Sequence, residues 1–185
     1  MKEDLRVKKS RKAIEDAFVS LIEEKGFENV KMIDIAKRAN VNRNTIYLHY
    51  SSKEDIIETL VDKVFNSGIV TLEPNAYLKG KYSKRNLYDL FFKMFTLIYE
   101  NIELYRIVLT DQNLSGYLTL RLKKVKSFVL NSLKPTFKNE IIVEYVVSGV
   151  FGITRNWIIY DKGSIEENVR LICDLVITNM RHAQY

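Results

Sequence analysis

The chain has 185 residues and a net charge of +6; 46% of its residues are hydrophobic and 28% are charged. This composition allows a buried core in one or two domains and excludes disorder over most of the length. Cys173 is the single cysteine and there are two histidines, which excludes disulfide scaffolds and zinc sites built from Cys or His clusters. We therefore expect no metal and no cofactor, and the basic charge favours an anionic partner such as nucleic acid.

Apolar residues recur at three- and four-residue spacing along most of the chain, which predicts an all-α fold of about nine helices. The first helix is expected to end at Gly26, because glycine accepts the left-handed conformation after a last helical turn. A short helix over 33–39 should end at Asn40, which tolerates the same conformation. Asn42 then caps a third short helix, Arg43 to His49.

The later helices also carry start signals. The pairs Ser51 with Glu54 and Ser164 with Glu167 match capping boxes, which open a longer fourth helix and the last helix. Residues 71–84 are expected to connect two helical bodies, and a long apolar helix is expected over 140–160. No segment approaches the roughly 20 apolar residues that span a bilayer, and the charged start of the chain lacks a signal-peptide core. We expect a cytoplasmic protein.

The segment from 33 to 49 has the form of a helix-turn-helix, with two short helices joined by a tight turn. Its second helix begins with polar and basic groups at Arg43, Asn44 and Thr45, which suits a helix that reads base edges from its N-terminal residues. From the residues alone, an ordinary three-helix bundle with a polar surface remains the alternative.

The run IAKRANVNRNTIYLHYSSKEDI resembles the DNA-binding domain of the tetracycline-repressor (TetR) family of bacterial regulators. The resemblance covers about residues 8–60, and its matching positions are Ile35-Ala36, Val41, Thr45-Ile46-Tyr47, His49-Tyr50 and Lys53-Glu54-Asp55-Ile56. The chain departs from the family pattern at Asn40, where glycine is usual, and at Lys31-Met32, where a capping threonine is frequent.

This resemblance implies a DNA-binding domain over 1–53 and a helical effector-binding and dimerisation domain over 54–185. It implies that Arg43, Asn44 and Thr45 face the major groove, that Tyr47 and His49 contact phosphates or flank the bases, and that Lys53 holds a phosphate at a helix N-terminus. For His49 an ordinary surface or core role remains the alternative. The basic residues of the first helix form either a solvated leader or an arm along the DNA: Lys8, Lys9, Arg11 and Lys12.

The resemblance also implies a homodimer formed by the last two helices, over about 140–160 and 164–181. The apolar character of these helices on more than one side fits such an interface, and a thick monomeric core is the alternative. The expected interface residues are Val146, Gly149, Val150, Ile153, Leu171 and Leu175.

Aromatic residues are dense in the middle helices, which suits a pocket for an apolar or aromatic effector. Plain core packing is the alternative, since aromatic residues at helical spacing usually form core. Arginines such as Arg106, Arg121 or Arg155 indicate an anionic effector instead. The expected pocket residues are Phe91, Phe95, Tyr99, Phe128 and Trp157.

Together these features predict a homodimeric transcriptional regulator that binds double-stranded operator DNA. The resemblance implies a repressor that a small-molecule effector releases from the operator. A co-regulator with the same fold that works mainly through a protein partner is the alternative. An enzyme is not expected, because no paired carboxylates, nucleophile–base pair or phosphate loop stands out.

Overall fold

The computed structural model describes residues 5–69 and 84–183. In these ranges the chain forms nine α-helices, one short 3-10 helix and no strand, which confirms the all-α prediction. The elements are α1 (Leu5–Lys25), η1 (Phe27–Asn29), α2 (Met32–Arg38), α3 (Arg43–His49), α4 (Lys53–Ile69), α6 (Lys84–Tyr99), α7 (Ile102–Thr110), α8 (Ser115–Leu130), α9 (Phe137–Tyr160) and α10 (Ile165–Met180).

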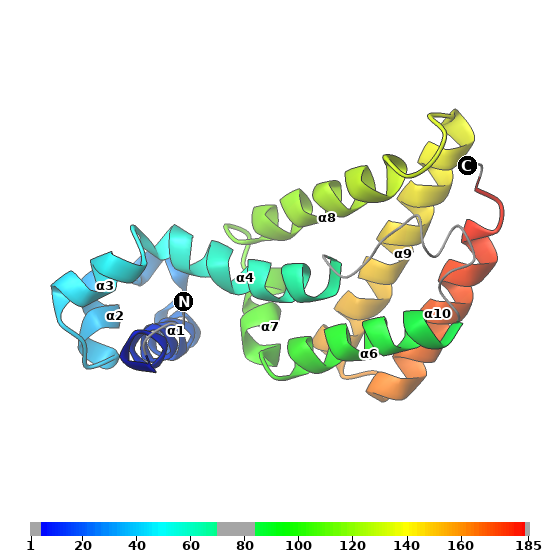
Figure 1. Cartoon of the computed structure of the whole chain (residues 1–185). Coiled ribbons are helices and arrows are strands. Elements are labelled where there is room, and N and C mark those ends of the chain that lie inside the picture. Colours follow the sequence, from blue (N-terminus) through cyan, green and yellow to red (C-terminus); the bar gives the residue numbers. More distant parts are fainter. Residues whose placement is uncertain (1–4, 70–83, 184–185) are drawn as a thin grey trace.

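The N-terminal helices form a small head, in which α1 packs against α2, α3 and the start of α4 (Figure 1). Phe18, Ile46 and Tyr50 are almost fully buried at its centre. Burial of such side chains stabilises the head by roughly 1.5–3 kcal/mol each. The same core continues through Leu104 and Leu118 into α7 and α8, so the head rests on the rest of the molecule.

Local sequence signals set the turn between α2 and α3 as predicted. Gly26 follows α1 with φ 76°, and Asn40 follows α2 in the left-handed conformation with φ 51°. The Asn42 side chain accepts a hydrogen bond from the Asn44 amide at 2.9 Å and thereby caps α3. These caps fix the angle at which α3 leaves the turn.

The cap of α4 lies one residue later than predicted. Ser52, not Ser51, accepts from the amide of Asp55 at 3.2 Å, and the Asp55 carboxylate accepts from the amide of Ser51 at 2.9 Å. An aspartate therefore takes the place that the pattern gave to Glu54, because a cap at Ser52 makes residue 55 the third residue of the helix. The second predicted capping box, Ser164 with Glu167, is confirmed with both of its hydrogen bonds present.

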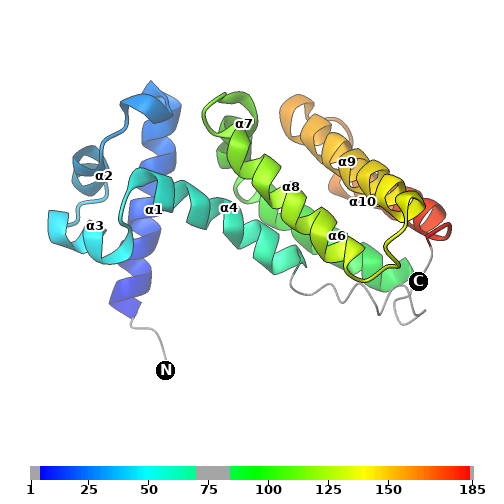
Figure 2. The same cartoon turned by 90° about the horizontal axis from the view of Figure 1, so that it is seen from above.

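Helices α6 to α10 form a second, larger body, with α9 and α10 at the side away from the head (Figures 1 and 2). Helix α10 packs against α6 and α9, and α8 packs against α9. Helix α4 starts in the head and packs against α6 and α8. The predicted domain boundary between residues 53 and 54 therefore falls at the first turn of a helix that contacts both bodies.

The connection predicted over 71–84 lies outside the described residues, apart from Lys84, which begins α6. Helix α9 begins three residues earlier than the predicted start at 140, because Thr136 caps it by accepting from the Asn139 amide at 3.3 Å. Among the described residues, α9 is the one helix that could cross a membrane by length and composition alone. Charged residues interrupt its apolar ones, so α9 holds no continuous run of roughly 20 apolar residues, which is the criterion used in the sequence analysis.

Candidate nucleic-acid interface

One face of α3 points away from the protein. Ile46 and Tyr50 are buried at 0% and 1% exposure, whereas Arg43 and Asn44 are exposed and Tyr47 and Leu48 are 48% and 83% exposed. In a helix these four exposed positions lie on neighbouring rows, since positions four apart share a face. The structure thus places Arg43, Asn44 and Tyr47 on one exposed face and adds Leu48, which the sequence pattern had not singled out.

The remaining predicted DNA-binding residues lie beside this face. Thr45 and His49 are half-buried on the flanks of α3. The Arg43 guanidinium lies over the Tyr47 ring, 5.9 Å from its centre, which restrains both side chains.

Lys53 is used within the chain. Its ammonium donates to the carbonyl oxygens of Phe27 and Glu28 at 2.9 and 3.3 Å and lies 4.3 Å from the centre of the Phe27 ring. The side chain therefore joins η1 to the start of α4. A phosphate contact by Lys53 stays a prediction, and the geometry adds a positioning role.

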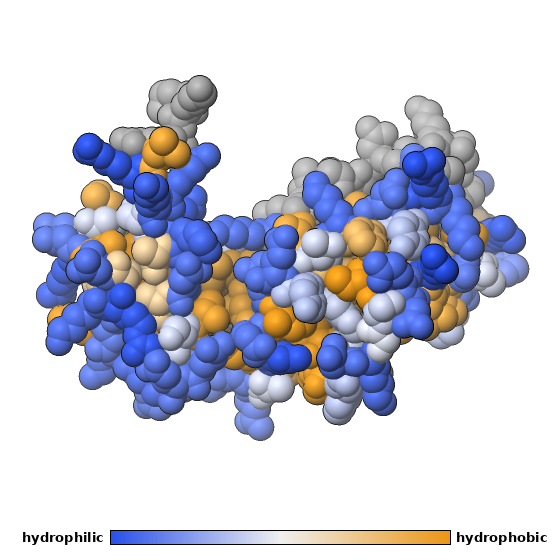
Figure 3. All heavy atoms as spheres, turned by 90° about the horizontal axis from the view of Figure 1, so that it is seen from below, coloured by the Kyte–Doolittle hydropathy of each residue, from blue (hydrophilic) through white to orange (hydrophobic). Residues whose placement is uncertain are grey.

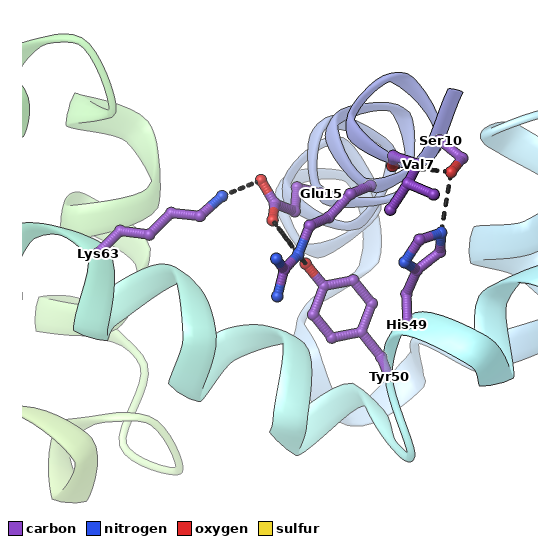
Figure 4. A network of polar contacts seen from close by, with 7 residues as sticks. Val7, Ser10, Glu15, His49, Tyr50 and Lys63 are labelled. Carbon is purple, nitrogen blue, oxygen red and sulfur yellow. Dashed lines mark hydrogen bonds and ion pairs between the residues drawn. The ribbon is translucent and has the colours of Figure 1, made fainter. Parts of the chain in front are cut away.

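His49 ties the end of α3 to the first helix (Figure 4). Its Nε2 atom lies 2.8 Å from the Ser10 hydroxyl oxygen, and that hydroxyl donates to the carbonyl oxygen of Val7 at 3.0 Å. Because a hydroxyl has one hydrogen, the imidazole Nε2 is assigned as the donor to Ser10. The basic first turns of α1 are thereby held next to the recognition surface.

A buried carboxylate joins α1, the end of α3 and α4 (Figure 4). Glu15 is only 7% exposed, and its Oε1 accepts a hydrogen bond from the Tyr50 hydroxyl at 2.5 Å. Its Oε2 forms an ion pair with Lys63 of α4, and Arg11 donates to the Tyr50 oxygen at 3.2 Å. Burial, together with the adjacent Glu15 carboxylate, raises the pKa of the Tyr50 phenol above its ordinary value.

Two ion pairs on the surface hold α2 against the end of α1. Arg38 donates through Nη2 to Glu24 at 2.7 Å, and Lys25 donates to Asp34 at 2.6 Å. The Arg38 guanidinium lowers the pKa of Glu24, and the Lys25 ammonium lowers the pKa of Asp34. Both carboxylates are charged at neutral pH, and the two pairs join α2 to the end of α1.

Beyond the head, α4 is held to α8 by a buried arginine. Arg121 is 2% exposed, donates to Glu58 at 3.1 Å and also forms an ion pair with Asp62. Tyr105 lies in the same region, where burial and the charge of Asp62 raise its pKa. Arg121 is thus paired within the chain.

Arg106 of α7 is also paired within the chain. It donates to the carbonyl oxygen of Ile158 at 3.0 Å and to Glu103 at 2.7 Å.

The residues predicted to line an effector pocket lie in different surroundings. Phe95 and Trp157 are buried against each other, with ring centres 4.7 Å apart, and Phe91 is partly buried against the same core. Tyr99 is 61% exposed, but its ring centre lies 6.4 Å from that of Trp157. Phe128 is exposed on α8. Within 5–69 and 84–183, no group of three or more His, Cys, Asp or Glu side chains is placed to hold a metal ion.

The residues predicted for a dimer interface lie on partly open surfaces of α9 and α10. Leu171 and Leu175 are 51% and 39% exposed, Gly149 is exposed, and the other three predicted residues are half-buried. The structure adds three exposed apolar residues along α9 that the pattern did not single out: Phe137, Ile141 and Tyr145. In the view of Figure 3, the largest hydrophobic areas lie on the body and where it meets the head.

A short helix with a polar outward face, held on a three-helix head by caps and ion pairs, is the arrangement of a helix-turn-helix DNA-binding protein. Residues 14–60 match the family described as bacterial regulatory proteins, tetR family. Residues 85–178 match a transcriptional regulator C-terminal region. The chain therefore belongs to the tetR family of transcriptional regulators.

Individual relatives agree with this assignment. The biofilm operon icaADBC negative transcriptional regulator IcaR of Staphylococcus epidermidis is 35% identical over 78 residues, which are 42% of this chain and 41% of that protein. The chain spans less than half the length of the curated relatives it matches.

Solved structures show the same fold at low identity. The dihydroxyacetone kinase operon activator DhaS is 17% identical with a TM-score of 0.66, over 95% of this chain and 98% of that one. The SmeT–triclosan complex is 15% identical with a TM-score of 0.68, over 95% of this chain and 92% of that one.

We expect the substitution Tyr50→Phe to lower the free energy of unfolding by about 1–2 kcal/mol, because Glu15 loses a buried hydrogen bond. The ordinary pKa of tyrosine is about 10, and below it the phenol is protonated in both states. Above it the unfolded chain releases the proton more readily than the folded chain, so the wild-type protein loses stability as the pH rises. Tyr50→Phe should lose less.

Urea unfolding at neutral and alkaline pH measures both effects. Tyr99→Phe is the matched control, because Tyr99 is 61% exposed, and it should behave as the wild-type protein does. Equal stability and equal alkaline loss in Tyr50→Phe and the wild-type protein would show that the Tyr50–Glu15 contact contributes nothing.

Proposed function

We propose that the protein is a homodimeric repressor that binds operator DNA in the cytoplasm and is released by a small-molecule effector, without enzymatic activity. The observation that carries DNA binding is the outward face of α3, with Arg43, Asn44 and Tyr47. These groups match major-groove chemistry, since arginine pairs with guanine and asparagine with adenine. Repression is supported by the likeness to IcaR, which is named a negative regulator.

Dimerisation through α9 and α10 is supported by the apolar residues that these helices leave exposed. Phe137, Ile141 and Tyr145 are 77%, 52% and 63% exposed and recur every four residues along α9. Exposed apolar residues in such a row mark an interaction surface. A two-fold axis beside α9 would bury this row and place two heads for successive major grooves.

Release by an effector is supported by the body's aromatic core and by SmeT, whose solved structure is a complex with triclosan. We place the effector beside Phe91, Phe95 and Trp157, with Tyr99 at the entrance. Phe128 is less suited to line this pocket, because its side chain is exposed on α8. An effector that separates Phe95 from Trp157 would shift α6 against α9, and α4 packs against α6.

A co-regulator that works through a protein partner is the second candidate. Such a protein would keep the fold that this chain shares with DhaS, which is named an operon activator. The polar start of α3 argues for DNA as the partner, because a protein-binding helix is expected to be more apolar at its centre. A gel shift with the DNA upstream of the protein's own gene distinguishes the two candidates.

We expect Arg43→Ala to weaken operator binding by about 1–3 kcal/mol and to relax the preference at one base pair of each half-site. Lys138→Ala is the control, because Lys138 is exposed on α9 in the body. Fluorescence anisotropy with the operator and single-base variants measures both effects. If Arg43→Ala binds the operator with unchanged affinity and unchanged base preference, this face of α3 does not contact the DNA.

We expect Gly149→Glu to convert the dimer to monomers. A Cβ built on Gly149 meets nothing within 4 Å in the chain, so the protomer accommodates the change and the clash must come from a partner. Gly116→Glu is the matched control, because Gly116 in α8 has equal space. Sedimentation at micromolar concentration measures the mass. A wild-type monomer, or a Gly149→Glu dimer, contradicts the assignment.

We expect an effector to weaken operator affinity by about 5–150-fold, and operator DNA to weaken effector affinity by the same factor. Trp157 is the single tryptophan, and its ring centre lies 4.7 Å from that of Phe95. Its fluorescence therefore reports occupancy in a screen of apolar and aromatic compounds. Compounds that quench Trp157 and leave operator affinity unchanged would refute release, and binding by anionic compounds alone would move the site away from these aromatics.

A further inference from the structure

Leu48 is the most exposed large hydrophobic side chain among the described residues, at 83%. It lies near the end of α3, between Tyr47 and His49. Packing does not explain this leucine, since the core of the head is filled by Ile46 and Tyr50 on the other side of the same helix. A leucine held in water on a short, well-capped helix is therefore available to a partner.

The surroundings of Leu48 indicate the chemistry of that partner. Leu48 follows Asn44 by four residues, so the two side chains lie on one row of the helix. Arg43 and Tyr47 form the neighbouring row, with the Arg43 guanidinium carbon 5.9 Å from the centre of the Tyr47 ring. Helix α3 carries no acidic residue, so nothing on it repels an anionic polymer. The exposed face of α3 thus carries the hydrogen-bonding side chains of Arg43 and Asn44 in its first turn and the apolar side chain of Leu48 in its last turn. This order suits a DNA partner.

The major groove presents one apolar group on its base edges, the 5-methyl group of thymine. A leucine that makes no hydrogen bond gains most by covering this methyl group. One helical turn rises about 5.4 Å, and base pairs stack about 3.4 Å apart. A thymine contacted by Leu48 therefore lies one or two base pairs from the position that Asn44 reads.

We propose that Leu48 is a specificity-determining residue that recognises a thymine methyl group in each half-site of the operator. This inference rests on the proposed DNA-binding function. It accounts for an apolar side chain on an otherwise polar reading face. It also assigns the last turn of α3 a part in base recognition, in addition to the first turn.

The test uses full-length protein and a duplex that the wild-type protein selects from random sequences. Each thymine of the selected site is replaced in turn by deoxyuridine, which removes only the methyl group. We expect wild-type affinity to fall about fourfold at one thymine in each half-site, the loss expected when one buried methyl group is removed. Leu48→Ala should bind the thymine duplex more weakly and should show no further loss with deoxyuridine.

Leu120→Ala is the matched control, because Leu120 is a 47% exposed leucine on α8; it should respond to deoxyuridine as the wild-type protein does. Circular dichroism melting shows whether each variant keeps its fold. A second selection with Leu48→Ala should lose the thymine preference at that position and keep the preferences set by Arg43 and Asn44.

Two outcomes would overturn the inference. If wild-type affinity is unchanged at every deoxyuridine, or if Leu48→Ala loses as much as the wild-type protein does, Leu48 contacts no methyl group while DNA binding stands. If the wild-type protein selects no duplex, the proposed DNA-binding function fails, and the role of Leu48 fails with it.

Discussion

The buried carboxylate of Glu15 is the group on which the arrangement of the head depends. A charged carboxylate removed from water is costly unless it is paired and hydrogen-bonded. Glu15 meets this requirement through Tyr50 at the end of α3 and Lys63 of α4, which reach it from different helices, and through Arg11 one turn earlier on α1. The requirement therefore fixes where the recognition helix ends and how α4 leaves the head.

Helix α4 extends this constraint to the body through neighbouring residues. Lys63 pairs with Glu15 of α1, and Asp62, one position earlier, pairs with Arg121 of α8. Successive residues of a helix point about 100° apart, so α4 contacts head and body from two of its sides. A rotation or shift of α4 acts on both contacts at once. Coupling between distant sites requires an element on which both sites act, and α4 contacts both the head and the body.

Much of the head could be predicted from sequence, because its signals are local. The positions of Asn40 and Asn42 depend on backbone conformation and capping within a few residues, and both predictions are confirmed. The cap of α4 was wrong by one residue, since serine occupies both 51 and 52 and the pattern cannot choose between them. The exposed face of α3 followed from periodicity, which nonetheless gave no reason to single out Leu48.

The polar contacts between helices could not be predicted in this way. Glu15 and Lys63 are 48 positions apart, and Arg121 and Glu58 are 63 apart. Nothing in the local pattern pairs them. Arg121 was one of several arginines considered for an anionic effector, and only the packing of α4 on α8 reveals its partners. The predicted pocket aromatics illustrate the same limit, since spacing alone does not distinguish Phe95, in the core, from Phe128, on the surface.

The burial of Arg121 has a consequence for how the protein responds to ionic strength. Counterions screen exposed charges within about 10 Å at 0.1 M salt, and protein–DNA affinity falls steeply as salt displaces phosphate contacts. In the pair of Arg121 with Glu58 the arginine is 2% exposed and the glutamate 51%, so salt screens this pair less than a pair of two exposed charges. A rise in salt is thus expected to weaken DNA contacts more than it weakens the contact of α4 with α8. Under the proposed release by an effector that acts through α4, a change in salt would therefore alter operator occupancy by a different route.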